Sequence, residues 1–266
     1  MRSTDFFDTH PVFTHQEFVN ARASRGTSKR TSDNLLAKHL AAGRLVRVRR
    51  GLYATVRPGV DPDQAPVDPY LVATRLAPDA TLAYHAALQF HGKAYSLWRR
   101  FHYLTRRRAR PFAFQGMSFV PVQVPLALRA PPDLGGGVVE KRYGGGVARV
   151  ATLERTLVDV LDAPDKGGGW EEIWRSLEMV EFFDLDDVIE YAVRLGSALT
   201  VARVGFFLDQ HRDALMVEDR HLDALRAHAP AQPRYLDPSR EPGRLVSTWN
   251  LVVPERVIDR AWQEVA

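Results

Sequence analysis

The chain has 266 residues, of which 45% are hydrophobic and 26% are charged, a composition typical of a folded, water-soluble protein with one large or two ordinary domains. It contains no cysteine, which excludes disulfides, thiolate metal sites and cysteine nucleophiles. The first nine residues lack the apolar run of a signal peptide, and no stretch of about 18 consecutive apolar residues could form a membrane span. These features predict a cytoplasmic protein with no membrane partner.

The charge of the chain is unevenly distributed along its length. The net charge is +4, but residues 20–57 hold ten Lys or Arg and one acid, Asp33, which gives this segment a net charge of +9. Residues 151–190 hold twelve acids and three bases, a net charge of −9. A basic end of this kind is typical of a protein that meets a polyanion. The acidic segment is interpreted equally well as a solvated surface.

Two helices are predicted in the basic N-terminal segment. Thr14 and Glu17 have the spacing of a capping box, which predicts a helix that begins there and ends at Arg25-Gly26. After a polar turn, a second helix is predicted from Thr31 or Ser32 to Ala42.

The spacing of apolar residues in the second helix predicts which side is buried. Its inward side chains are Leu35, Leu36 and Leu40, and its outward side chains are Asn34, Lys38 and His39. Gly43 follows at the position where a helix needs a left-handed residue to stop.

A hairpin is predicted directly after this helix. Two β-favouring runs, residues 44–48 and 52–55, flank the basic turn Arg49-Arg50-Gly51, and Tyr53 is expected to be structural. Two helices followed by such a hairpin predict a winged helix-turn-helix, in which the second helix enters the major groove and the hairpin reaches phosphates. The side chains predicted to contact double-stranded DNA are Lys29, Arg30, Thr31, Ser32, Asn34, Lys38, Arg44, Arg47, Arg49 and Arg50. The alternative is a winged helix that docks a protein partner.

Three stretches of the chain together resemble the AbiEi antitoxin family of type IV toxin–antitoxin systems. They are residues 36–54 (LAKHLAAGRLVRVRRGLYA), residues 82–92 (LAYHAALQFHG) and residues 152–161 (TLERTLVDVL), the last followed by a glycine triplet at 167–169. One departure from the family is the short connection from Arg25 to Lys29, which leaves the start of the recognition helix open.

The resemblance implies a bacterial protein that represses its own promoter. Its winged helix would bind repeats there, and its C-terminal domain would counteract a nucleotidyltransferase-like toxin. The family also has members without an obvious toxin gene beside them, so a stand-alone transcriptional regulator stays open. One winged helix reads few base pairs, and we therefore expect a monomer in solution with two copies on an inverted repeat.

The remainder of the chain predicts a larger α+β domain. Residues 1–57 form the winged helix, the proline-rich residues 58–69 form a linker, and residues 70–266 form the larger domain. Asp68 and Pro69 are expected to begin a helix through Leu76. Another helix is predicted from Leu82 to His91. Strands and then helices follow in the sequence, which is typical of α+β folds. The expected strands are 101–104, 112–114, 118–124, 138–143, 147–150 and 244–253, and the expected helices are 152–161, 170–179, 185–195, 200–210 and 219–228.

A second basic patch interleaves arginines with aromatic residues around Phe101 and Tyr103. Its members are Arg99, Arg100, Arg106, Arg107, Arg108 and Arg110. This composition is typical of a nucleic-acid surface. Charge that protects the edge of a sheet, or a face for an acidic partner, explains it as well.

The motifs of the common enzyme classes are absent. The glycine triplets at Gly135, Gly144 and Gly167 continue into neither a P-loop nor a dinucleotide-binding fingerprint. Asp184 and Asp186 imitate a metal-binding pair but stand where a helix N-terminus favours aspartates. His85 and His91 are six residues apart, which is wrong for ligands on one helical face, and are interpreted as packing or surface residues. The sequence predicts a protein that is not an enzyme and needs no metal or cofactor.

The acidic helices are the remaining candidate for a partner contact, with a solvated surface slightly favoured. Their acids are Glu171, Glu172, Glu178, Glu181, Asp184, Asp186, Asp187 and Glu190.

Overall fold

The computed structural model of the chain describes residues 3–24, 26–129 and 136–262, and divides into two compact units. Unit 1 consists of Met1–Leu82, Arg99–Val122 and Glu140–Arg149, and unit 2 of Ala83–Trp98, Gln123–Val139 and Val150–Ala266. Each unit is therefore assembled from several chain segments. The expectations that concern Arg25 and Gly135 lie outside the described residues.

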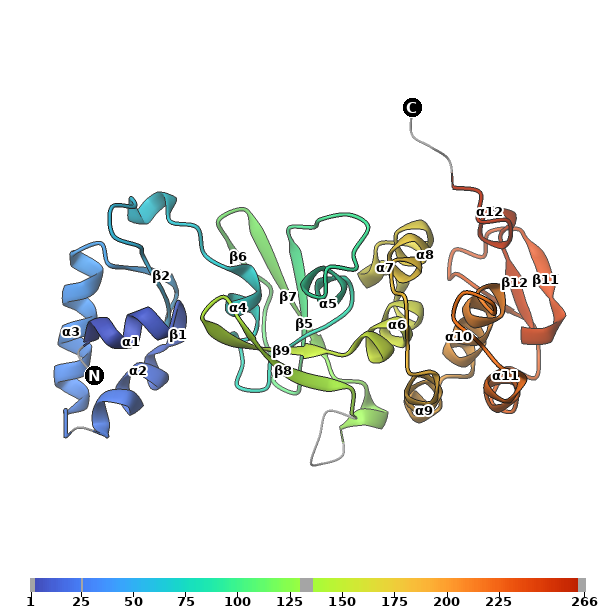
Figure 1. Cartoon of the computed structure of the whole chain (residues 1–266), viewed down its shortest axis with the longest axis horizontal. Helices are drawn as coiled ribbons and strands as arrows, with labels where there is room; N and C mark the ends of the chain where they lie inside the picture. The colour runs from blue at the N-terminus through green and yellow to red at the C-terminus, as the bar shows by residue number, and fades with distance from the viewer. Residues whose placement is uncertain (1–2, 25, 130–135, 263–266) are drawn as a thin grey trace. The chain divides into compact units, whose positions relative to one another are not determined.

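Unit 1 begins with a module of helices and a small sheet, which we call the N-terminal module (Figure 1). Its elements are α1 (Ser3–Thr9), β1 (Val12–Thr14), α2 (His15–Ala23), α3 (Lys29–Ala41), β2 (Leu45–Arg49) and β3 (Leu52–Thr55). The strands form an antiparallel sheet in the order β1-β3-β2. The two expected helices and the hairpin are present, and α1 and β1 are additions to the expected elements.

Local hydrogen bonds explain where α2 and α3 begin. The capping box expected at Thr14 is confirmed: its hydroxyl accepts from the Glu17 N–H at 3.2 Å, and the Glu17 carboxylate accepts from the Thr14 N–H. The start expected for α3 at Thr31 or Ser32 is wrong. The helix begins at Lys29, because the hydroxyl of Ser28 accepts from the Thr31 N–H at 3.2 Å.

The core of the N-terminal module is largely aromatic. It consists of Phe6, Phe7, Phe13, Phe18, Leu36, Leu45 and Tyr53. The ring of Phe6 makes edge contacts with Phe13 and Phe18 at centroid distances of 5.1 and 5.3 Å. Burial of each such ring stabilises the fold by roughly 1.5–3 kcal/mol. This gain explains why α1, a helix of seven residues, is stable in this position.

Gly43 ends α3 in the left-handed conformation expected for it, with φ +67°. A Cβ atom on Gly43 would lie 2.9 Å from Cγ of Pro62. Gly43→Ala is therefore expected to lower the free energy of unfolding by about 2 kcal/mol or more, from backbone strain of roughly 1–2 kcal/mol plus this contact. Urea unfolding measures the change.

The matched control is Gly59→Ala. Gly59 also has a positive φ of +81°, but nothing lies within 4 Å of its added Cβ atom. It should show the strain alone, about 1 kcal/mol. Equal losses in the two variants would contradict the assigned contact with Pro62.

Most of the remainder of unit 1 is a six-stranded sheet in the order β6-β7-β5-β4-β9-β8. The strands are β4 (Thr81–Leu82), β5 (Arg100–Thr105), β6 (Phe112–Phe114), β7 (Met117–Gln123), β8 (Val138–Tyr143) and β9 (Gly146–Ala151). The short helices η1 (Pro62–Gln64) and α4 (Pro69–Ala73) precede the sheet. As expected, Asp68 caps α4 by accepting from the Leu71 N–H at 2.9 Å, but the helix ends at Ala73 rather than at Leu76.

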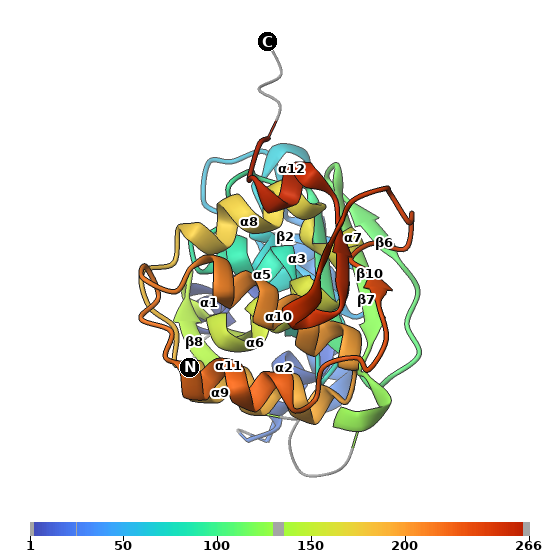
Figure 2. The ribbon, with the colours of Figure 1, turned by 90° about the vertical axis from the view of Figure 1, so that its right-hand side faces the viewer.

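Unit 2 is mainly helical, and its helices α6, α9, α10 and α11 contact one another (Figure 2). The helical elements are α5 (His85–Phe90), η2 (Leu126–Leu128), α6 (Leu153–Asp162), α7 (Pro164–Gly167), α8 (Trp170–Glu178), α9 (Leu185–Leu195), α10 (Ala198–Gln210), α11 (Asp219–Arg226), η3 (Ser247–Trp249) and α12 (Glu255–Ile258). The strands are β10 (Arg234–Tyr235), β11 (Arg244–Val246) and β12 (Leu251–Val253). The chain is thus mixed α+β, as expected.

Two of the expected elements of unit 2 are corrected. The helix expected from Leu82 begins only at His85, because Leu82 pairs with Tyr103 in the sheet. The single strand expected over residues 244–253 is instead β11, η3 and β12. Trp249 is fully buried against Gly205, and Asn250 has a positive φ of +49°, so the chain turns and β11 pairs antiparallel with β12.

Candidate nucleic-acid interface

The first turns of α3 present their charged side chains to solvent. Lys29, Arg30 and Thr31 are exposed, and the hydroxyl of Thr31 lies 2.9 Å from that of Ser28. Ser32 differs from them, because it is fully buried and its hydroxyl donates to the Ser28 carbonyl at 3.2 Å. The side chain of Ser32 therefore fixes the helix start and is not available to a ligand, contrary to the prediction.

The outward face of α3 continues through Arg30, Asn34 and Lys38, all exposed and spaced four residues apart. Side chains at this spacing lie on one face of a helix. Two polar cations and an amide on one face are the side-chain types that read base edges and phosphates.

His39 was expected to face outward, and this expectation is wrong. Its side chain is buried, and its ring makes an edge contact with Phe7 at 4.8 Å. Burial lowers the pKa of His39, and the positive charges of Arg44, Lys38 and Arg22 lower it further. The positive charges of these three side chains therefore all reach His39, near the C-terminal end of α3.

The β2–β3 hairpin carries four arginines in different environments. Arg44, Arg47 and Arg50 are exposed, whereas Arg49 is half-buried. The guanidinium of Arg49 donates to the Leu76 carbonyl and lies 6.0 Å from the ring centroid of Phe112. Arg49 thus joins the hairpin to the sheet of unit 1 and is a structural contact.

The tip of the hairpin lies beside the start of α3. The His15 N–H donates to the Gly51 carbonyl at 2.8 Å, and Nε2 of the same histidine lies 2.6 Å from a carboxylate oxygen of Asp33. Asp33 is the acid of the basic segment, so its charge is held in a contact with His15. His15 therefore contacts both the hairpin tip and the first turns of α3, two segments that each carry exposed cations.

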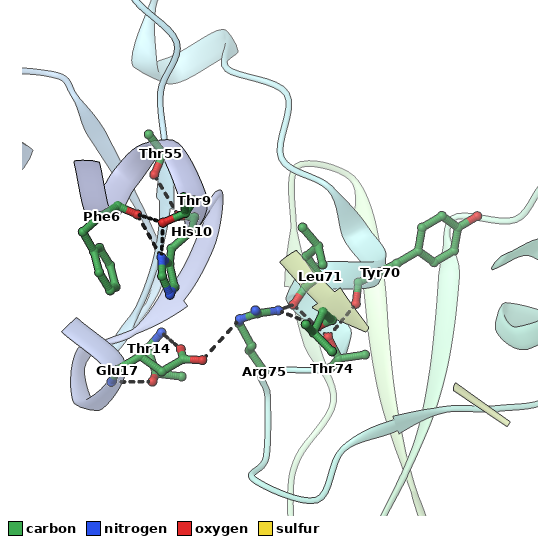
Figure 3. Close-up of polar contacts among 11 residues, drawn as sticks. Phe6, Thr9, His10, Thr14, Glu17, Thr55, Tyr70, Leu71, Thr74 and Arg75 are labelled. Atoms are coloured by element: carbon green, nitrogen blue, oxygen red, sulfur yellow. Dashed lines mark hydrogen bonds and ion pairs between the residues drawn. The ribbon is translucent and has the colours of Figure 1, made fainter. Parts of the chain in front are cut away.

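A further ion pair connects the N-terminal module to the segment that follows α4 within unit 1 (Figure 3). Nε of Arg75 lies 3.7 Å from Oε1 of Glu17, the residue that completes the capping box of α2. The Arg75 guanidinium also donates to the carbonyls of Leu71 and Val147 at 3.4 and 3.3 Å. No local pattern in the sequence indicates the contacts of Arg75 with Glu17 and Val147, because these partners lie far apart along the chain.

The second basic patch is divided by the structure into two groups. Arg99 and Arg100 stand at the start of β5, where the Arg99 carbonyl accepts from the Ser118 N–H at 2.7 Å. Arg106, Arg107, Arg108 and Arg110 follow the other end of the strand, and all six arginines are exposed. At about 3.3 Å per residue the strand separates the two groups by roughly 17 Å.

The charge of each unit is more extreme than the charge of the chain. Unit 1 contains 21 Lys and Arg against nine Asp and Glu, a net charge of +12. Unit 2 contains 15 Lys and Arg against 23 Asp and Glu, a net charge of −8. A polyanion would accordingly be attracted to unit 1.

The acids of the predicted acidic surface in unit 2 are in part structural. Asp184 caps α9, as expected, and Asp186 pairs with Arg220 at 2.9 Å. Glu172 is an exception to the surface interpretation. Its carboxylate is buried and lies 2.9 Å from Nε2 of His85, and it accepts from the N–H and the hydroxyl of Ser96 at 2.9 and 2.8 Å.

The histidines of the helix motif have the packing roles expected for them. The His85 ring stacks on Trp98 at a centroid distance of 4.2 Å, and Nε2 of His91 lies 2.8 Å from the Ala151 carbonyl. Among the described residues, no group of three or more His, Asp or Glu is arranged to hold a metal ion. None of the helices in the described part of the chain could span a bilayer.

The glycine triplets have turn conformations. Gly144 and Gly145, with φ +53° and +79°, connect β8 to β9. Gly168 and Gly169, with φ +103° and +83°, connect α7 to α8.

Comparison with known proteins agrees with the resemblance in the sequence. Residues 1–56 match the model of a family described as transcriptional regulator, AbiEi antitoxin. No curated protein matches the chain. The crystal structure of the RV2827C protein from Mycobacterium tuberculosis is similar in fold, with a TM-score of 0.60 and 20% sequence identity over 97% of this chain and 91% of that chain.

Proposed function

We propose that this protein, whose residues 1–56 are those of an AbiEi antitoxin transcriptional regulator, binds double-stranded DNA through its N-terminal module. In this proposal α2 and α3 form a helix-turn-helix and the β2–β3 hairpin is its wing. Arg30, Asn34 and Lys38 face the base edges, and Arg47 and Arg50 contact phosphates, as the outer residues of such modules do.

The observation that carries the proposal is that His15 contacts both of the basic segments, the hairpin tip and the start of α3. Lys29 and Arg30 begin α3, and Arg50 stands at the hairpin tip, which His15 holds beside that helix. Cations on both a helix and a hairpin can reach a groove and its flanking phosphates together. A module that only docks a protein has no comparable need for this charge.

The proposed DNA is the promoter of the protein's own gene. The chain is a monomer that binds as two copies on an inverted repeat, since one module reads few base pairs. Repression follows because a bound regulator blocks the polymerase. The domain division expected from the sequence, with residues 1–57 for DNA and residues 70–266 for other contacts, is part of this proposal.

The test is binding of the full-length protein to labelled DNA from upstream of its gene, against scrambled DNA, across a salt series. We expect preferential binding, with affinity falling about 10³ to 10⁵-fold between about 50 and 200 mM salt if six to ten phosphates are contacted. Equal binding of both DNAs would contradict promoter recognition, and absent binding would contradict the DNA proposal as a whole.

The antitoxin part of the proposal concerns residues 70–266. It is supported by the family of the N-terminal residues, whose members are described as antitoxins. The partner is a nucleotidyltransferase-like toxin, recognisable by Gly-Ser and Asp-x-Asp motifs in a neighbouring gene. Growth of cells that express this toxin should return when the present chain is co-expressed, and continued arrest would contradict the antitoxin role.

A further inference from the structure

The loop between β5 and β6, residues 106–111, begins at a fixed base. The hydroxyl of Thr105 and the N–H of Arg106 both donate to the Asp79 carboxylate at 2.7 Å. Burial would raise the pKa of Asp79, but these two hydrogen bonds hold it below its ordinary value. The carboxylate at the base of the loop is therefore engaged in holding the backbone.

The end of the loop is fixed to the tip of the hairpin. Phe112 is the first residue of β6, and the Arg49 guanidinium carbon lies 6.0 Å from the centroid of its ring. The Arg49 guanidinium also donates to the Leu76 carbonyl. Arg50 follows Arg49 directly, and Arg110 precedes Phe112 by two residues. The exposed arginines of the hairpin tip and of the loop thus flank one contact.

This contact adds the loop to the two basic segments that His15 contacts. His15 holds the hairpin tip beside the first turns of α3, and Arg49 holds the same tip beside the loop. Arg106, Arg107, Arg108 and Arg110 are exposed, and residues 99–122 contain no acid. The helix start, the hairpin tip and the loop accordingly each carry exposed cations, and the acids beside them, Asp33 and Asp79, are engaged with His15 and with the base of the loop.

Edge protection is a weaker explanation for the loop arginines. β6 is the outermost strand of the sheet, and its residues Phe112–Phe114 carry no charge. Charges that prevent pairing of an edge stand on the strand itself. Here they stand outside the strand, in the loop that Asp79 and Arg49 hold at either end.

We propose that the β5–β6 loop is a second phosphate-binding surface, which contacts the backbone of the same DNA duplex that the N-terminal module binds. The inference rests on the proposed function and deepens it. The loop contacts carry no sequence information, and they add to the affinity and salt dependence of binding. The operator is therefore longer on the hairpin side than one winged helix covers.

The test compares three double variants of the full-length protein on a labelled duplex of about 30 base pairs, roughly three helical turns. Arg108→Ala with Arg110→Ala removes charge from the loop. Arg99→Ala with Arg100→Ala is the matched control, because it removes the same charge from the opposite end of β5. Arg47→Ala with Arg50→Ala tests the hairpin.

The loop variant is expected to lower the slope of log K against log salt by about 1.8, which corresponds to two phosphate contacts. The control at the other end of β5 should leave the slope unchanged. Equal effects of the two variants would show a general charge effect and overturn the inference. If the hairpin variant lowers the slope and the loop variant does not, the inference about the loop is overturned, whereas the proposed function is still supported. If the wild-type protein does not bind the duplex, both the inference about the loop and the proposed function are contradicted.

Discussion

Replacing Arg47 and Arg50 together by alanine is expected to weaken binding to every DNA duplex by about 100-fold, at unchanged fold stability. Both side chains are exposed on the β2–β3 hairpin. A hydrogen bond to a charged group contributes roughly 1.5–3 kcal/mol, so two lost phosphate contacts amount to about 3 kcal/mol. Because phosphates carry no sequence information, specific and scrambled duplexes should lose affinity equally.

The contrasting variant is Asn34→Ala on the outward face of α3. Loss of a contact to a base edge costs about 1–3 kcal/mol and relaxes specificity at one position. Asn34→Ala should therefore weaken binding to the promoter while leaving the affinity for scrambled DNA nearly unchanged. Fluorescence anisotropy titrations of both duplexes measure the two effects. A hairpin variant that loses only specific binding, or an Asn34 variant that loses both kinds equally, would contradict the assigned roles.

Arg49 is a further control for this experiment. The sequence groups it with Arg50 as a hairpin cation, but the structure engages it with the Leu76 carbonyl and the Phe112 ring. Arg49→Ala should consequently lower the free energy of unfolding of unit 1, which Arg50→Ala should not. Comparison of the Arg49→Ala and Arg50→Ala variants thus distinguishes the effect of losing a structural contact from the effect of losing a DNA contact.

The second large effect concerns the buried carboxylate of Glu172. Burial would raise its pKa, but the hydrogen bonds from His85 and Ser96 lower it to about 2. The folded-state pKa is depressed, so the stabilisation is fully present above the ordinary pKa of 4.5 and is lost as the pH falls toward about 2. At 1.36 kcal/mol per pKa unit, the full effect is roughly 3 kcal/mol.

Glu172→Gln keeps the shape of the side chain and removes its charge. We expect this variant to be less stable at neutral pH and to show a smaller loss of stability between about pH 4.5 and pH 2, because the contribution of Glu172 is removed. Urea unfolding at several pH values measures both effects. Glu171→Gln is the matched control, because Glu171 is only half-buried and its carboxylate pairs with Arg175 at 2.9 Å. Such surface pairs contribute about 1 kcal/mol or less. An unchanged pH profile in Glu172→Gln would contradict the role assigned to the carboxylate.

Several helix caps and the β2–β3 hairpin of this protein were determined by the sequence itself. The Thr14–Glu17 capping box, the stop at Gly43 and the cap at Asp68 are all found where the local pattern predicts them. The physical reason is that a cap or a tight turn depends on residues within a few positions of one another. The separation of a basic surface from an acidic segment was also visible in the charges along the chain.

Burial and the meeting of distant segments were decided only by the tertiary structure. Ser32 and His39 lie on a helix whose polar pattern gives no sign of their burial, and Phe6 and Phe7 reach the core through a helix that the sequence did not predict. Whether a side chain is buried depends on which surfaces pack against it, and those surfaces come from elsewhere in the chain. For the same reason only the fold could join residues 99–122 and 140–149 to the basic N-terminal module and raise the charge of unit 1 to +12.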